Sequence, residues 1–255
     1  MATGYLTSIS SSKTASSLRS LTYTWDKLGN LKSRADARLN IRDDFTYDPL
    51  NRLTQSKTTA GSTPQTTVTV AYDALGNITS KSDIGTYTYG STDSCGGLAG
   101  PHAVRAVAGV KTASYCYDAN GAMISGDGRT ITWGAFGMPT RIVSGLRAID
   151  IVYGPDRARF KRVDTNETGT STTHYVAGGA YETVTSAGKT VLKLTVAGVA
   201  VVINTSTTPG VWTSEIQYLL TDHLGSVDVI TNAAGAVVER LSFDAWGKRR
   251  TFDWK

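Results

Sequence analysis

Residues 22–31 read Thr-Tyr-Thr-Trp-Asp-Lys-Leu-Gly-Asn-Leu, and the pattern returns along the chain. Related segments occupy residues 46–53, 71–78, 116–124 and 242–247. Their common unit is aromatic-Asp-x-x-Gly/Asn-x-Leu/Ile, and more degenerate copies lie between them. A unit that returns every two dozen or so residues is typical of repeat architectures, in which each copy is one supersecondary element.

The repeating unit predicts a β-hairpin with a fixed corner. Aromatic residues two apart, such as Tyr23 and Trp25, lie on one face of a strand. Asp26, at the end of that strand, can accept backbone N–H groups of the turn as an Asx turn. Gly29 suits the left-handed conformation that closes a short, bulged hairpin. Because an isolated hairpin is marginal in water, such hairpins must pair edge to edge with their neighbours.

The predicted fold is therefore all-β, with consecutive antiparallel hairpins forming a curved, spiralling sheet. Further turn signals divide residues 174–203 and 218–244 into strands, whereas residues 60–65, 91–101 and 206–210 are predicted loops. The candidate site residues are structural corners of the repeat: Tyr23, Trp25, Asp26, Gly29, Tyr47, Asp48, Tyr72, Asp73, Gly76, Tyr117, Asp118, Gly121, Asp222, Gly225, Phe243, Asp244 and Gly247.

The composition of the 255 residues agrees with a β fold and excludes several classes. Charged residues make up only 18% and hydrophobic residues 40%, which argues against a coiled coil, a helical bundle or a charged disordered tail. The net charge of +5 is scattered apart from residues 248–250, which we interpret as a solvated turn, so we expect no nucleic-acid binding. No apolar run predicts a membrane span, and the abrupt, leaderless start suggests a piece of a longer chain.

The sequence offers no catalytic or metal-binding constellation, and we expect no cofactor. The histidines His102, His174 and His223 are far apart, and Cys95 and Cys116 form no Cys-x-x-Cys pair. Two cysteines can form one bridge, but their low number favours free thiols. We expect Asp222 to cap a turn in which His223 is exposed.

Two features together resemble the YD repeat of RHS proteins: the aromatic-Asp-x-x-Gly-Asn/Arg-Leu unit and a block near the end of the chain. In that block, residues 222–227 read Asp-His-Leu-Gly-Ser-Val and residues 243–250 read Phe-Asp-Ala-Trp-Gly-Lys-Arg-Arg, which is similar to the opening of the RHS repeat-associated core. The resemblance covers residues 20–255. It divides the chain into a lead-in (1–20), a repeat shell (21–215) and the start of the core (216–255).

The resemblance implies a hollow, cocoon-like shell that encloses a C-terminal toxin. In bacterial members the associated core closes the shell and in many cleaves the chain as an aspartyl autoprotease. The expected partners are the C-terminal effector domain, the remaining shell repeats and a secretion apparatus. The expected location is secreted or cell-surface, with type VI secretion, attachment to the cell wall and bacterial competition as the family's contexts.

This sequence departs from the family at the cleavage segment, since no Asp-Pro-x-Gly-Leu is present. We therefore expect no enzymatic activity from this chain, although a share in the autoprotease is a competing hypothesis. The other alternative is a cell-surface adhesin or carbohydrate-binding module, in which aromatic residues such as Trp133 and Trp246 stack on glycans. An excised arc of sheet would also have two unpaired edges, which predicts self-association.

Overall fold

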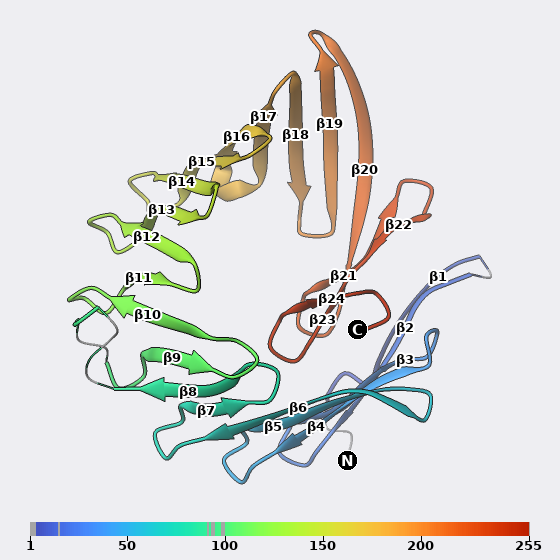
Figure 1. The fold of residues 1–255 in the computed structure, drawn as a ribbon. Helices are drawn as coiled ribbons and strands as arrows, with labels where there is room; N and C mark the ends of the chain where they lie inside the picture. The colour runs from blue at the N-terminus through green and yellow to red at the C-terminus, as the bar shows by residue number, and fades with distance from the viewer. Residues whose placement is uncertain (1–3, 15, 91, 93–94, 98–99, 255) are drawn as a thin grey trace. The chain divides into compact units, whose positions relative to one another are not determined.

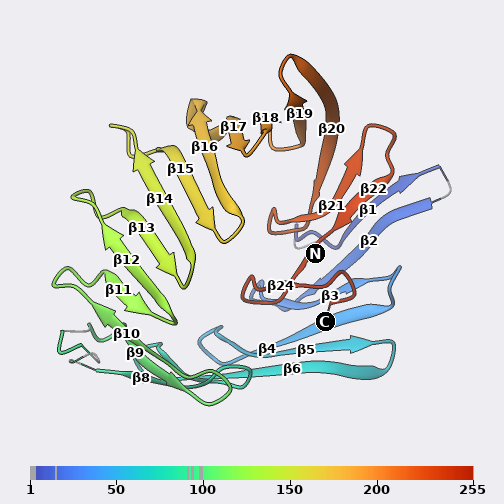
Figure 2. The same ribbon diagram turned by 45° about the horizontal axis from the view of Figure 1, so that its top comes forward.

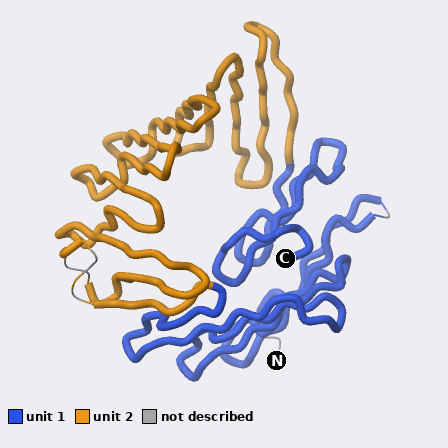
Figure 3. Tube along the Cα trace, in the orientation of Figure 1, with its two compact units in different colours: residues 1–83, 218–255 blue, residues 84–217 orange. Residues whose placement is uncertain are grey.

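The computed structural model describes residues 4–14, 16–90, 92, 95–97 and 100–254, and it confirms the predicted all-β fold. Strands follow one another along the chain and pair antiparallel (Figure 1). Within the described ranges the single helical element is a 3₁₀ turn, η1 (Ala177–Gly179). The chain divides into two compact units, residues 1–83 with 218–255, and residues 84–217 (Figure 3).

The first unit contains two sets of strands from opposite ends of the chain. The β4, β5 and β6 strands lie side by side in both ribbon views (Figures 1 and 2). Its strands are β1 (Ser8–Lys13), β2 (Ser16–Trp25), β3 (Leu31–Asp36), β4 (Ile41–Tyr47), β5 (Leu53–Ala60), β6 (Thr63–Tyr72), β7 (Ile78–Lys81), β21 (Val227–Asn232), β22 (Val237–Arg240), β23 (Ser242–Phe243) and β24 (Arg249–Arg250).

The second unit is a run of antiparallel hairpins from β8 onward. Its strands are β8 (Gly85–Tyr89), β9 (Val104–Ala108), β10 (Ala113–Tyr117), β11 (Met123–Gly126), β12 (Arg129–Trp133), β13 (Pro139–Ser144), β14 (Arg147–Tyr153), β15 (Arg159–Asn166), β16 (Gly169–Val176), β17 (Tyr181–Ser186), β18 (Lys189–Val196), β19 (Ala200–Thr208) and most of β20 (Val211–Thr221). The turns predicted within residues 174–203 are present between β16 and β19.

Two of the predicted loops are wrong, because strands extend through them. Residues 60–65 contain the end of β5 and the start of β6, so only a short turn remains. Residues 206–210 likewise begin inside β19. Thr-rich segments pair well in a sheet, so their polarity misled the loop prediction. Residues 91–101 lie partly outside the described residues.

The lead-in predicted for residues 1–20 contains a paired hairpin, because β1 pairs with β2. The division into compact units follows spatial contacts and differs from the predicted boundaries at residues 21 and 216. The boundaries at residues 21 and 216 follow from the family resemblance and remain predictions.

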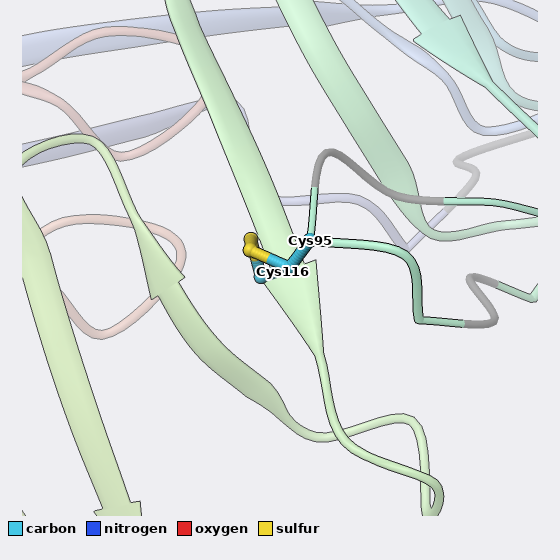
Figure 4. Close-up of a disulfide and its surroundings, with 2 residues drawn as sticks. All are labelled: Cys95 and Cys116. Atoms are coloured by element: carbon cyan, nitrogen blue, oxygen red, sulfur yellow. A yellow bond between two sulfur atoms is a disulfide. The ribbon is translucent and has the colours of Figure 1, made fainter.

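Cys95 and Cys116 form a disulfide, so the expectation of free thiols was wrong (Figure 4). Their Cα atoms are 5.7 Å apart, and Cys116 is buried on β10. The number of cysteines could not reveal this pairing, because the fold alone brings the segment around Cys95 beside β10. The bridge ties an irregular segment of the second unit to a regular strand.

We predict that the disulfide stabilises the second unit by about 3 kcal/mol, since it closes a loop of 21 residues. Dithiothreitol should lower the denaturant midpoint of the wild-type chain and leave that of the Cys95→Ala/Cys116→Ala double variant unchanged. Alkylation of both cysteines in denatured, unreduced protein, read by mass spectrometry, would contradict the bridge.

Candidate functional site

The five-residue corner at residues 26–30 shows how the repeat turns the chain. The backbone N–H of Asp26 donates to the carbonyl of Asn30 over 2.9 Å, and that of Gly29 donates to the carbonyl of Asp26 over 3.3 Å. The Asp26 Oδ1 atom accepts the N–H groups of Leu28 and Asn30, each over 2.8 Å. One carboxylate oxygen thus satisfies two turn donors that the hairpin cannot satisfy itself.

The same two backbone hydrogen bonds recur at nine corners in the described ranges. They start at Asp26, Asp48, Asp73, Asp118, Gly134, Gly154, Asp222, Asn232 and Asp244. All six aspartates in this set accept both turn N–H groups on Oδ1. The aspartates and glycines selected from the sequence therefore lie at equivalent places, dispersed along the sheet.

The fourth corner position always has positive φ, which explains its preference for glycine. Gly76 has φ of 89°, Asn51 has 60° and Arg157 has 62°. Three corners lack the first aspartate and start at Gly134, Gly154 and Asn232. At Asn232 the side-chain oxygen accepts the N–H of Ala236 over 2.9 Å. At Gly154 the carboxylate of Asp156 instead accepts the N–H of Ala158 over 3.0 Å.

Hydrogen bonds favour the charged form of the corner carboxylates of Asp26 and Asp48. The side chain of Asn30 donates to Asp26 and, with the turn N–H groups, lowers the pKa of Asp26. The backbone N–H and guanidinium of Arg52 lower the pKa of Asp48 in the same way. Because these two pKa values lie below the ordinary value of about 4, the corners at Asp26 and Asp48 contribute stability above that pH and lose it as the pH falls further.

The aromatic residue before each of several corners latches one hairpin to its neighbour. The Tyr47 hydroxyl donates to the carbonyl of Leu31 over 3.0 Å, and the Tyr72 hydroxyl to the carbonyl of Leu53 over 2.8 Å. Each acceptor is the first residue of the neighbouring return strand. In the second unit the acceptors also begin strands, with the pairs Tyr117 to Val104, Trp133 to Met123 and Tyr153 to Pro139.

This latch explains why tyrosine or tryptophan precedes six of the nine corners, whereas Thr221, Thr231 and Phe243 precede the other three. Both tyrosine and tryptophan combine an apolar body with a polar donor at the tip. Trp25 follows the same geometry, since its Nε1 donates to the carbonyl of Leu6 over 2.8 Å. Sequence analysis assigned these aromatics to strand faces and missed the latch, although the alternation of tyrosine with tryptophan was its signal.

A second arrangement joins the two ends of the first unit. A row of facing residues crosses the sheet, with Tyr23 opposite Arg34, Arg34 opposite Asp43, and Asp43 opposite Thr58. Asp43 is fully buried, with Arg34 Nε 2.9 Å and Thr58 Oγ1 2.5 Å from its carboxylate. Arg250, from β24, adds a contact of 2.9 Å to Asp43 Oδ2.

The C-terminal segment closes over this row. Arg34 and Arg250 both donate to the carbonyl of Phe243. The indole of buried Trp254 lies 5.4 Å from the guanidinium of Arg34 and 5.1 Å from that of Arg250. Such cation–π contacts stabilise desolvated cations. We call the set Arg34, Asp43, Thr58, Arg250 and Trp254 the anchor cluster.

Burial raises the pKa of Asp43, but the hydrogen bond from Arg250 and the charge of Arg34 outweigh it. The pKa of Asp43 therefore lies below its ordinary value. The anchor cluster contributes stability above about pH 4, and protonation of Asp43 removes it as the pH falls further.

The anchor cluster corrects the interpretation of residues 248–250 as a solvated turn. Arg249 is exposed, whereas the side chain of Arg250 is 10% exposed and paired with Asp43. Asp43 was not selected from the sequence. Its signal was the alternation in β4, which places it on the same face as Ile41 and Phe45.

His223 also differs from its prediction. Asp222 caps the turn as expected, but the His223 ring packs 4.5 Å from the ring of Tyr23 and 6.3 Å from that of Trp25. Burial lowers the pKa of His223 and raises that of Tyr23 to about 12. The ring is a packing element, because the corner carries it onto two aromatic side chains of β2.

We predict that Tyr72→Phe destabilises the protein by about 1 kcal/mol, because the carbonyl of Leu53 loses its donor. The matched control is Tyr218→Phe, since Tyr218 is exposed and its hydroxyl has no hydrogen bond to the residues that the structure describes. Equal urea midpoints for the two variants would show that the latch contributes nothing.

We predict that Asp43→Ala costs about 3–5 kcal/mol, because two largely buried guanidinium groups lose their carboxylate. It should also speed tryptic cleavage at Arg249 and Arg250 at pH 8. Asp44→Ala, one residue away in an exposed ion pair with Arg42, should shift stability by less than about 1 kcal/mol. Equal losses for the two variants in thermal unfolding would contradict the anchor cluster.

Comparisons with known proteins agree with this geometry. Residues 25–63, which include the corners at Asp26 and Asp48, match the family model described as RHS Repeat. No curated protein matches the sequence. The Tc holotoxin pore of Photorhabdus luminescens, with a mutated TccC3, is 16% identical with a TM-score of 0.54, and the match covers 94% of this chain and 16% of that chain.

Two further structures are similar at lower scores. The crystal structure of TcdB2-TccC3 is 14% identical with a TM-score of 0.41, covering 90% of this chain and 16% of that chain. That of TcdB2-TccC3-Cdc42 is 13% identical with a TM-score of 0.42, covering 97% and 17%. The chain thus spans about one sixth of the chains that it matches. The resemblance to RHS proteins is confirmed: this chain carries the RHS repeat, and it shares its all-β fold with a Tc toxin chain.

Proposed function

We propose that this chain is part of the wall of a bacterial RHS-type toxin and encloses a C-terminal effector until delivery. The observation that carries the proposal is the latch, by which the aromatic residue of one corner bonds to the start of the neighbouring return strand. Strand pairing and latch together join successive hairpins by both backbone and side-chain hydrogen bonds. A wall of this kind sequesters a protein by steric exclusion alone.

The anchor cluster supports a role in closing the wall. It fixes the segment that is similar to the start of the RHS repeat-associated core onto β3, β4 and β5. The core of RHS proteins closes the shell, so this contact is where the closing element would attach. The partners we propose are the effector domain and the further repeats of the same shell.

We propose that the chain has no enzymatic activity of its own. The corner aspartates already bind turn N–H groups, and Asp43 is committed to two arginines. Carboxylates whose oxygens are already occupied in this way are poor candidates for proton transfer, and the pKa values of Asp43 and Asp73 are also lowered. We expect the purified chain to give no new band on a gel after incubation. Self-cleavage would contradict this proposal.

We also propose a secreted or cell-surface location. The disulfide supports it, because such bridges persist in oxidising compartments. In the described ranges, no helix is long and apolar enough to cross a membrane. Type VI secretion, attachment to the cell wall and bacterial competition are supported by the family resemblance alone.

The glycan-binding alternative gains no specific support. Trp133 donates its indole N–H to the carbonyl of Met123, and the Trp246 ring lies 4.2 Å from the ammonium of Lys81. Both side chains thus have structural contacts. The functional proposal therefore remains enclosure.

Protease protection tests enclosure. The effector domain of the parent toxin should resist proteinase K with the repeats intact and be digested quickly once they are removed or denatured. A parent carrying Asp43→Ala should lose protection, whereas one carrying Asp44→Ala should keep it. Equal digestion of the effector with and without the repeats would refute enclosure.

A further inference from the structure

A small, partly open cavity with a mixed polar and apolar lining lies in the first unit, beside the anchor cluster. Its volume is about 50 Å³, and its lining includes four arginines, Arg19, Arg34, Arg38 and Arg240. They come from β2, β3, the turn after β3 and the end of β22. So many guanidinium groups around a space of this size demand anions to balance them.

Three of these arginines have carboxylate partners. Arg19 lies 2.9 Å from Asp228, Arg34 lies 2.9 Å from Asp43, and Arg38 lies 3.1 Å from Asp36. Asp43 is shared between Arg34 and Arg250, so that trio carries an excess positive charge.

Arg240 forms no ion pair with any residue in the described ranges. Its Nη1 donates to the carbonyl of Leu18 over 2.6 Å. Asp36 and Asp228 also act on its charge, but they are bound to Arg38 and Arg19, so three arginines share two carboxylates here. Burial, together with the charge of Arg38, lowers the pKa of Arg240. The two guanidinium groups thus repel each other in a partly desolvated place.

Arg38 carries a buried hydrogen-bond donor that is not satisfied. Its Nε is buried and has no hydrogen-bond partner among the described residues. A buried donor without an acceptor costs about 1–3 kcal/mol. The other carboxylates at the cavity are already engaged, since Asp222 caps its corner and Asp228 is bound to Arg19.

We propose that the cavity binds one carboxylate group between Arg38 and Arg240. A carboxylate would accept the free Nε–H of Arg38 and balance the charge of Arg240, in the planar geometry that guanidinium groups recognise. The volume of about 50 Å³ admits one such group. The carboxylate comes either from a free small acid or from an acidic side chain of a polypeptide laid over the cavity. The inference does not depend on enclosure of an effector.

Thermal unfolding of the 255-residue chain tests the site. Sodium formate should raise the midpoint by roughly 3–6 °C at ten times its dissociation constant, relative to sodium chloride at equal ionic strength. The capped peptide acetyl-Ala-Glu-Ala-amide tests a side-chain source, against acetyl-Ala-Gln-Ala-amide. A response to the Glu peptide beyond that to formate identifies a polypeptide ligand, and a response to formate alone identifies a free acid.

Variants separate binding from a general salt effect. Arg240→Gln should fold, because Arg240 forms no ion pair with the described residues and its removal relieves the repulsion from Arg38. The variant should bind formate at least tenfold more weakly, as judged from the concentration that raises the midpoint. Arg38→Gln should do the same, whereas Arg42→Gln, at an exposed position of β4, should respond like the wild type. Formate and chloride having equal effects, or an unchanged formate shift in Arg240→Gln, would overturn the proposal.

Discussion

The structure depends on one carboxylate oxygen that accepts two backbone N–H groups. In a bulged five-residue turn the strand pairing leaves these donors unsatisfied, and at six of the nine corners an aspartate within the turn supplies the acceptor. Aspartate supplies this acceptor from the first position of the turn, because its short side chain places an oxygen beside both N–H groups. Once that oxygen is in place, the left-handed fourth residue and the opening of the return strand follow. The corner is thus a local solution, and a chain can repeat it without changing the rest of its sequence.

Local corners do not by themselves assemble a sheet. The latch supplies the connection, because the aromatic tip of one corner requires the carbonyl at the base of its neighbour. This geometry fixes the stagger between successive hairpins, as Tyr47 and Tyr72 each reach the first residue of the adjacent return strand. In the second unit a disulfide adds a covalent link beside the latch of Tyr117.

The corners could be predicted from the sequence because everything that forms them lies within about seven consecutive residues. The anchor cluster could not, because Asp43 and Arg250 are distant in sequence and their pairing is a property of the folded sheet. The prediction of free thiols was wrong for the same reason, because Cys95 and Cys116 come together only in the folded sheet. His223 was placed correctly in its turn, yet its burial depends on Tyr23, which no local pattern connects to it. The errors at residues 60–65 and 206–210 came instead from treating polarity as a loop signal.

The polar character of the anchor cluster follows from the repetition itself. Successive hairpins present similar surfaces, so an apolar C-terminal segment would find several nearly equivalent places to dock. A buried carboxylate with Arg34 on one side and Thr58 on the other accepts only a segment that brings a matching guanidinium. Shifting the segment by one hairpin would leave Arg250 and Asp43 buried without each other, which is a heavy penalty. The ion cluster therefore contributes position more than affinity, because it fixes where the C-terminal segment docks on a sheet of similar hairpins.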